Sequence, residues 1–156
     1  MSDFQPPRSG KCTTDKQRDD KSMQCHWMTP IYHEGYLYGS SGRHESNAEL
    51  RCIDFNTGKV LWSQEDLMRA SLLMVDGHFL CLGENGVLRL VKVNPKKYDE
   101  VAKMEIVSPE KDVRPQAWTT AVARLPFWAA PVLSHGLLYV RGGKYLICYE
   151  LIPPKK

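Results

Sequence analysis

From residue 27 onward, short apolar runs alternate with short polar segments that contain glycine, and this pattern occurs three times along the chain. In each unit a few apolar residues come first, one or two polar residues and a glycine follow, and a second apolar run comes next. Two such runs predict a β-hairpin, because tight hairpin turns need a residue that tolerates positive φ. The glycines of the three turns are Gly35, Gly77 and Gly136. We expect the second runs to end at further glycine-containing turns, near Gly39, Gly83 and Gly142.

Further apolar runs predict a third strand in each unit, at residues 50–53, 87–91 and 145–149, and a fourth strand in the first two units, at 59–62 and 98–104. The first two units begin about 40 residues apart, and four short antiparallel strands at this spacing are typical of β-propeller blades. Several runs are apolar at almost every position, as expected for strands buried on both faces. A two-layer sandwich, which is the alternative, would show a cleaner alternation of apolar and polar residues.

The pattern therefore predicts an all-β fold of antiparallel four-stranded blades, about three of them, forming a partial β-propeller. The blades would span residues 27–66, 70–107 and 127–151. An insertion at 108–126 separates the second blade from the third, and residues 152–156 form a tail. Residues 1–25 are polar, have little apolar surface to bury and are predicted to be disordered.

Composition and charge narrow the classes of function. The net charge is only +3 and the basic residues are dispersed, so the sequence gives no reason to expect a nucleic-acid partner. No apolar run approaches the roughly 20 residues needed to span a bilayer. The N-terminal segment lacks the apolar stretch of a secretory signal, so the sequence as written predicts a cytoplasmic protein. If the sequence is truncated at its N-terminus and the full-length protein carries a secretory signal, we expect the protein outside the cytoplasmic membrane instead.

The five cysteines include no C-x-x-C pair, and three of them, Cys52, Cys81 and Cys148, lie in apolar runs. Cysteines in such runs are usually small buried side chains, and an odd number without close pairs argues against a disulfide framework. The spacing of cysteine and histidine residues matches no zinc pattern, so no metal site is predicted.

The most specific motif runs from Cys52 to Trp62 and contains Asp54, Thr57 and Gly58. Asp and Thr have short side chains that hydrogen-bond to the backbone of turns, and Gly adopts the left-handed conformation that closes a hairpin. The large apolar surface of Trp62 would fit between neighbouring blades.

This motif resembles the A-x-D-x-x-T-G-x-x-x-W signature of pyrroloquinoline-quinone (PQQ)-type propeller repeats, with Cys52 in place of the alanine. The W-x-x-P segments that begin at Trp27 and Trp128 are similar to the openings of the innermost strands in such blades. The resemblance covers residues 27–151. It implies that Trp27, Asp54, Thr57, Gly58, Trp62 and Trp128 have structural roles in the repeats.

The family resembled has two branches. One resembles BamB, a non-enzymatic propeller of outer-membrane assembly, and it implies a scaffold for protein–protein interaction without cofactor. The alternative is a fragment of a PQQ-dependent alcohol or sugar dehydrogenase, which would bind PQQ and calcium. Membership of the dehydrogenase branch would imply a vicinal cysteine pair and a carboxylate cluster spaced for calcium. The sequence has neither, so the scaffold is favoured and no catalytic residue is predicted.

Two long segments, Gly39–Glu49 and 108–126, are expected to project from the same face of the blades, where binding loops of rigid scaffolds usually lie. In the first segment, Arg43, His44 and Glu45 either bind an anionic or polar group or form a solvated loop with local ion pairs. In the second, Trp118 either anchors a partner or packs the insertion onto a blade.

Three blades cannot close a ring of the usual four to eight. We therefore expect the chain to be part of a larger propeller, completed by further blades, by a protein partner, or by further copies of the chain in a homo-oligomer.

Overall fold

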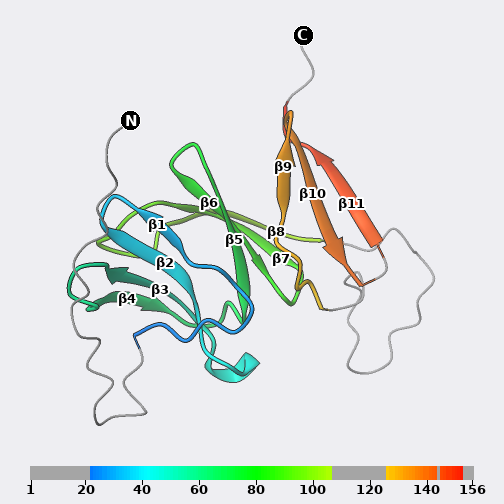
Figure 1. The fold of residues 1–156 in the computed structure, drawn as a ribbon. Helices are drawn as coiled ribbons and strands as arrows, with labels where there is room; N and C mark the ends of the chain where they lie inside the picture. Colours follow the sequence, from blue (N-terminus) through cyan, green and yellow to red (C-terminus); the bar gives the residue numbers. More distant parts are fainter. Residues whose placement is uncertain (1–21, 107–125, 144, 153–156) are drawn as a thin grey trace, which may run out of the picture.

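The computed structural model describes residues 22–106, 126–143 and 145–152, and within these residues the chain forms three antiparallel sheets (Figure 1). Sheet 1 contains β1 (Ile31–His33), β2 (Tyr36–Ser41), β3 (Glu49–Asp54) and β4 (Val60–Gln64) in that order. Sheet 2 contains β5 (Ala70–Val75), β6 (His78–Gly83), β7 (Val87–Lys92) and β8 (Glu100–Glu105). Sheet 3 contains β9 (Val132–Ser134), β10 (Leu137–Gly142) and β11 (Tyr145–Glu150). The all-β prediction is confirmed, and the strand numbers and strand order are those of a partial propeller.

The three predicted hairpin turns lie between the first two strands of each sheet. At Glu34 and Gly35 the φ angles are 47° and 89°, and the two later turns repeat this pair of positive values. Two successive residues at positive φ define the tight turn that matches the twist of antiparallel strands. The turn residues of the second and third hairpins are Asp76, Gly77, His135 and Gly136.

Of the second set of predicted glycine turns, those near Gly83 and Gly142 are confirmed: these glycines end β6 and β10, and the turns that follow them contain Gly86 and Gly143 at positive φ. The turn predicted near Gly39 was wrong, because Gly39 lies within β2. At Gly39 the reason is space, because a Cβ atom there would lie 3.0 Å from the Cβ of Pro30. Strand β2 therefore continues to Ser41, and the connection to β3 is shorter than predicted and contains a short 3₁₀ helix, η1 (Glu45–Asn47).

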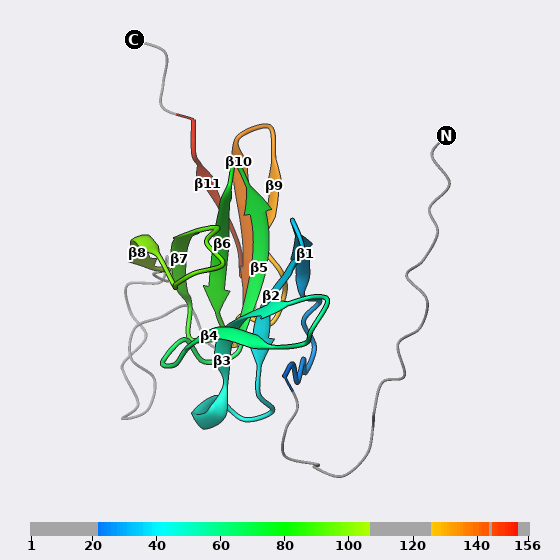
Figure 2. The ribbon, with the colours of Figure 1, turned by 90° about the vertical axis from the view of Figure 1, so that its left-hand side faces the viewer.

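The three sheets stack face to face, as the view of Figure 2 from the side of sheet 1 shows. Side chains opposite each other in paired strands share a face, as do side chains two residues apart. In sheets 1 and 2 we call the face toward the next sheet in the chain the forward face, and the equivalent positions define the forward face of sheet 3. The forward face carries Ile31, Tyr38, Leu50 and Cys52 in sheet 1, Leu73, Leu80, Leu88 and Leu90 in sheet 2, and Val132, Tyr139, Leu146 and Cys148 in sheet 3. The backward face carries Tyr32, Leu37 and Ile53, then Met74, Phe79 and Val91, then Leu133, Leu138 and Tyr149.

Two apolar cores fill the spaces between the sheets. In the first, the forward face of sheet 1 packs on the backward face of sheet 2, with Tyr38, Cys52 and Phe79 at most 1% exposed. In the second, the forward face of sheet 2 packs on the backward face of sheet 3, with Leu82 and Leu138 fully buried. The same repeat positions therefore make both contacts, which explains why the strands of sheet 2 are apolar on both faces.

Residues 22–25, predicted from the sequence to be part of the disordered segment, instead bind to sheet 1. The backbone N–H of Gln24 donates to Ser41 Oγ at 2.9 Å, and Arg51 Nη1 donates to the carbonyl of Ser22 at 3.1 Å. The rest of the predicted disordered segment, most of the insertion at 108–126 and most of the tail lie outside the described residues. No strand follows β11 in the described part of the chain.

Candidate functional site

Several connecting segments meet at one end of the three sheets. The N–H of Glu84, between β6 and β7, donates to the carbonyl of Arg69, which lies between β4 and β5. The N–H of Phe127, in the segment that leads into sheet 3, donates to the carbonyl of Glu84 at 3.1 Å. The loop between β2 and β3 reaches the same place through Arg43. Of the two segments predicted to lie at one end, the β2–β3 loop does so, and most of the insertion at 108–126 lies outside the described residues.

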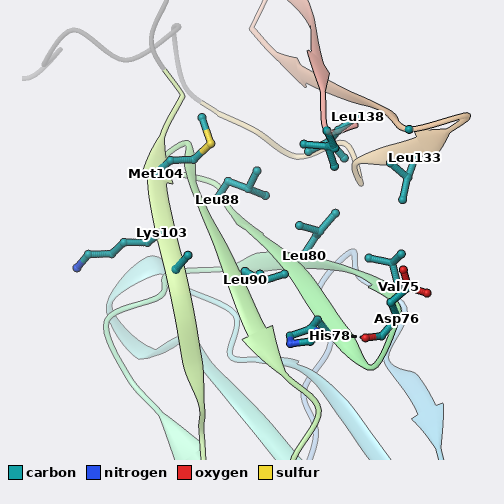
Figure 3. A pocket seen from close by; sticks show the side chains of 13 residues that line it. Val75, Asp76, His78, Leu80, Leu88, Leu90, Lys103, Met104, Leu133 and Leu138 are labelled. Carbon is teal, nitrogen blue, oxygen red and sulfur yellow. Dashed lines mark hydrogen bonds between the residues drawn. The ribbon is translucent and has the colours of Figure 1, made fainter. Parts of the chain in front are cut away.

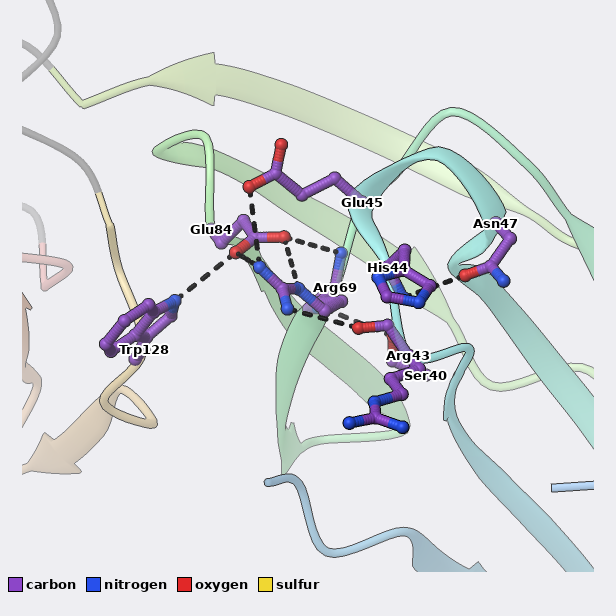
Figure 4. A network of polar contacts seen from close by, with 9 residues as sticks. Ser40, Arg43, His44, Glu45, Asn47, Arg69, Glu84 and Trp128 are labelled. Atoms are coloured by element: carbon purple, nitrogen blue, oxygen red, sulfur yellow. Dashed lines mark hydrogen bonds and ion pairs between the residues drawn. The ribbon is translucent and has the colours of Figure 1, made fainter. Parts of the chain in front are cut away.

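Arg69 and Glu84 form a bidentate ion pair at this end (Figure 4). The distances are 2.7 Å from Arg69 Nε to Glu84 Oε1 and 2.6 Å from Nη2 to Oε2. The Glu84 side chain is only 4% exposed and that of Arg69 15%. The hydrogen bonds that Arg69 donates to the Glu84 carboxylate raise the pKa of Arg69 above its usual value. Both charges are therefore held in a fixed, largely dry geometry, in which two parallel hydrogen bonds are stronger than a single contact.

The ion pair also binds the β2–β3 loop. Arg69 Nη1 donates to the backbone carbonyl of Arg43 at 3.2 Å, and Nη2 lies 3.4 Å from Glu45 Oε1. The Glu45 carboxylate is more than half exposed. Because water screens an exposed carboxylate, Glu45 adds little energy, whereas the buried carboxylate of Glu84 is the main partner of Arg69.

Two tryptophans complete the cluster. Trp128 Nε1 donates to Glu84 Oε2 at 3.3 Å, and Arg69 Cζ lies 4.4 Å from the ring centroid of Trp27, which is cation–π geometry. The two indole rings lie 5.7 Å apart. We call Trp27, Glu45, Arg69, Glu84 and Trp128 the polar clasp, because together they join sheet 1, sheet 2 and the segment that leads into sheet 3.

The three loop residues predicted as a binding site lie beside the clasp rather than forming a separate pocket. Arg43 contributes its backbone carbonyl, and its side chain is exposed. His44 is exposed, and its backbone N–H donates to Asn47 Oδ1 at 2.9 Å. Glu45 forms the ion pair with Arg69. Of the two interpretations of this loop, local ion pairing describes Glu45, and Arg43 and His44 remain on the surface. Trp118 lies outside the described residues.

Arg69 and Glu84 were not predicted from the sequence, although the repeat contains a signal for them. Counting from the hairpin glycines, Arg69 holds the position of Trp27 and Trp128, and Glu84 holds the position of Gly42. A charged residue at a position that is aromatic or glycine in another repeat indicates a contact particular to that repeat. Aligning the three units position by position marks both positions as unusual but does not show that the two side chains bind each other.

The repeat motif in sheet 1 has the hydrogen bonds that its residue types predict. Asp54 Oδ1 accepts from the N–H and from the hydroxyl of Thr57, both at 2.8 Å, and Gly58 has φ of 72°. These hydrogen bonds lower the pKa of Asp54, the side-chain bond from Thr57 most of all. The motif therefore builds the turn between β3 and β4.

Trp62, at the end of the motif, lies between sheets 1 and 2. Its Nε1 donates to the carbonyl of Asn94 at 2.9 Å, and its ring centroid lies 6.0 Å from that of Tyr98. It also approaches Tyr38. The predicted packing of this tryptophan between neighbouring units is what the structure has.

An apolar groove of about 480 Å³ lies at the corresponding place between sheets 2 and 3 (Figure 3). Its walls include Leu80, Leu90 and Met104 of sheet 2 and Leu133 of sheet 3. Strand pairing explains the groove, because Ala102 is paired with Leu90 as Trp62 is paired with Cys52. A methyl group in sheet 2 thus takes the place of an indole ring in sheet 1.

Within the described ranges, no three His, Cys, Asp or Glu side chains are grouped as they would be to hold a metal ion. The described part of the chain also contains no helix with the length and apolar character to cross a membrane. The sequence matches no protein-family model, and no curated protein matches it significantly.

Proposed function

We propose that this chain is a non-catalytic scaffold of the β-propeller type, built from PQQ-like repeats similar to those of BamB, that binds other proteins at the end where the polar clasp lies. One observation supports this proposal above all. The charged groups that converge at this end, Arg69 and Glu84, are bound to each other. They hold the loops in place and leave neither group of the pair free to act as an acid, a base or an anion receptor.

The surface around the clasp suits protein recognition. Trp128 is 56% exposed although its indole N–H is fixed on Glu84, so a rigid aromatic face is presented to solvent. The exposed side chains of Arg43 and His44 lie on the adjacent loop. Tryptophan and arginine are enriched at the energetic centres of protein interfaces, and loops fixed on a rigid scaffold commonly carry binding function.

Site-specific photocrosslinking of the full-length protein in its native cells tests this proposal. A photoreactive amino acid at His44 is expected to yield a discrete adduct with a partner protein. The same amino acid at Lys103, an exposed position on β8, is the matched control and is expected to yield none. Equal adducts at both positions, or none at His44, would contradict the proposed binding end.

The dehydrogenase alternative makes a separate prediction. A quinoprotein binds PQQ with calcium in a saturable manner and reduces an artificial electron acceptor when an alcohol or sugar is supplied. We expect the purified chain to show neither property in equilibrium dialysis with PQQ and Ca²⁺ and in a dye-linked assay. Saturable PQQ binding would overturn the non-catalytic assignment.

A further inference from the structure

The forward face of sheet 3 is apolar and open to solvent. Val132 is 58% exposed and Leu146 is 70% exposed, and Cys148, two residues from Leu146 on β11, is exposed as well. The equivalent positions in the other sheets are core: Leu50 is 1% exposed and Leu88 is 6% exposed. Residue types that build the contact between sheets elsewhere in the chain are thus left uncovered at this end.

The backward face of sheet 1, at the opposite end of the stack in Figure 1, carries the matching half of such a contact. Tyr32 and Phe55 are 58% and 47% exposed, and their rings pack edge to face with centroids 5.1 Å apart. Their equivalents in sheet 2, Met74 and Val93, both pack against the first core. The equivalence of Phe55 and Val93 is exact in hydrogen bonding, because each donates its N–H to the carbonyl of its hairpin glycine.

The segment before β1 extends this matching half. Met23 lies over Gly39, so the segment covers the part of the backward face of sheet 1 that surrounds Gly39. The equivalent segment before β5 contains Leu67, which is 2% exposed and lies in the core between sheets 1 and 2. In the second repeat, the segment that precedes β5 is therefore part of the contact between sheets 1 and 2 and does not replace that contact.

We propose that a second copy of this chain docks on the forward face of sheet 3 through the backward face of its own sheet 1, so that copies associate head to tail. Both contacts between sheets within the chain join a forward face to a backward face, and the faces with exposed apolar side chains at the two ends of the stack are one of each kind, with part of the backward face of sheet 1 covered by the segment before β1. By equivalence with Ile31 and Met74, which both pack against the first core, Val132 would meet Tyr32 of the second copy. This inference rests on the blade-like stacking used in the proposed function.

Two single variants and their mixture test the head-to-tail contact. Val132→Glu blocks the forward face of sheet 3, and Tyr32→Glu blocks the backward face of sheet 1; both positions are exposed, so the fold should survive, as circular dichroism would check. By light scattering we expect an oligomer for the wild type, a monomer for each variant alone, and a 1:1 dimer when the two variants are mixed. Mixing restores one complete contact, since each variant supplies the face that the other lacks. Val101→Glu, at a residue 57% exposed on β8, is the matched control and should behave as the wild type.

Three results would overturn the proposal: a monomeric wild type, an oligomer formed by Tyr32→Glu alone, or a mixture that stays monomeric. An oligomer formed by Tyr32→Glu alone would mean that the forward face of sheet 3 pairs with itself. A monomeric wild type would mean that the forward face is covered by further blades of a longer chain. Leu146→Glu replaces Val132→Glu if the latter does not fold. Partner crosslinking at His44 is read out separately at the other surface, so failure of self-association leaves the proposed function standing.

Discussion

Arg69 lies on the ring of Trp27, with Cζ 4.4 Å from the ring centroid, although the two residues hold the same position in successive repeats. Trp128 holds that position in the third repeat and lies 5.7 Å from Trp27. The residues that open the three repeats therefore meet at one point, where Glu84 binds two of them. The stability of this junction therefore depends on one buried carboxylate.

Glu84→Gln is expected to lower the free energy of unfolding by about 3 kcal/mol, because it leaves the largely buried guanidinium of Arg69 without its main counter-charge. Urea denaturation followed by circular dichroism measures the change. Glu45→Gln is the matched control; its carboxylate is 62% exposed and pairs with the same guanidinium, so a loss below about 0.5 kcal/mol is expected.

The double variant Arg69→Met/Glu84→Leu separates charge pairing from packing. Removing both charges leaves no unpaired buried ion, so the double variant should be more stable than Glu84→Gln. A double variant that is less stable, or equal losses for Glu84→Gln and Glu45→Gln, would show that the buried ion pair does not stabilise the junction.

Gly142→Ala is expected to cost about 1–3 kcal/mol, the range typical of overpacking. A Cβ atom at Gly142 would collide with the ring of Phe127, which is 1% exposed in the second core. Combining Gly142→Ala with Phe127→Leu should cost less than the sum of the two single changes, because the smaller side chain makes room for the methyl group. Additive losses in thermal or urea unfolding would mean that the two residues are not coupled.

The hairpins and the β3–β4 turn could be predicted from the sequence because each depends on a few neighbouring residues. Glu34 and Gly35 are adjacent, and Asp54, Thr57 and Gly58 lie within five residues of one another. Gly39 was misread as a turn because its reason is contact with Pro30 and Met23 in three dimensions. A glycine needed for close packing and a glycine needed for positive φ look the same in a sequence.

The polar clasp could not be predicted from local pattern for a related reason. Arg69 and Glu84 are separated by strands β5 and β6, and either residue alone resembles an ordinary surface charge. Only the arrangement of the sheets brings them together and removes them from water. Likewise, the open faces of sheets 1 and 3 become apparent only when equivalent positions are compared between sheets, because Val132 and Leu146 look like core residues in the sequence.

Asp54→Asn is expected to change how stability depends on pH. Hydrogen bonds from Thr57 lower the pKa of Asp54 in the folded state, so the ionised form stabilises the fold above its unfolded pKa of about 4. This contribution is lost as the pH falls through the lower, folded-state pKa. The wild type should therefore exceed Asp54→Asn in urea midpoint at pH 7, and the difference should shrink in acid. A difference that is constant from pH 7 to acid would contradict this role, since other carboxylates cancel in the comparison.

Ala102→Leu is expected to stabilise the protein by about 0.5–1 kcal/mol, because it places additional apolar surface in the groove between sheets 2 and 3. The melting temperature should rise by a few degrees. Val101→Leu is the matched control, since Val101 is the neighbouring residue on β8 and is exposed on the opposite face, and it should change stability by less than about 0.5 kcal/mol. Equal effects of the two changes would mean that the groove does not take up the added side chain.

The rates at which buried and exposed cysteines react with a thiol reagent test the proposed head-to-tail association. Burial raises the pKa of the Cys81 thiol to about 12, so at pH 8 Cys81 is almost entirely protonated, inaccessible and expected to react with a thiol reagent only after unfolding. Cys148 is exposed on the forward face of sheet 3 and should react rapidly in dilute protein. If a second copy covers that face, the labelling rate of Cys148 should fall as protein concentration rises, and Tyr32→Glu, which cannot dock, should abolish this dependence. The variant Cys148→Ser identifies the signal, and a rate that is independent of concentration in the wild type would contradict the head-to-tail contact.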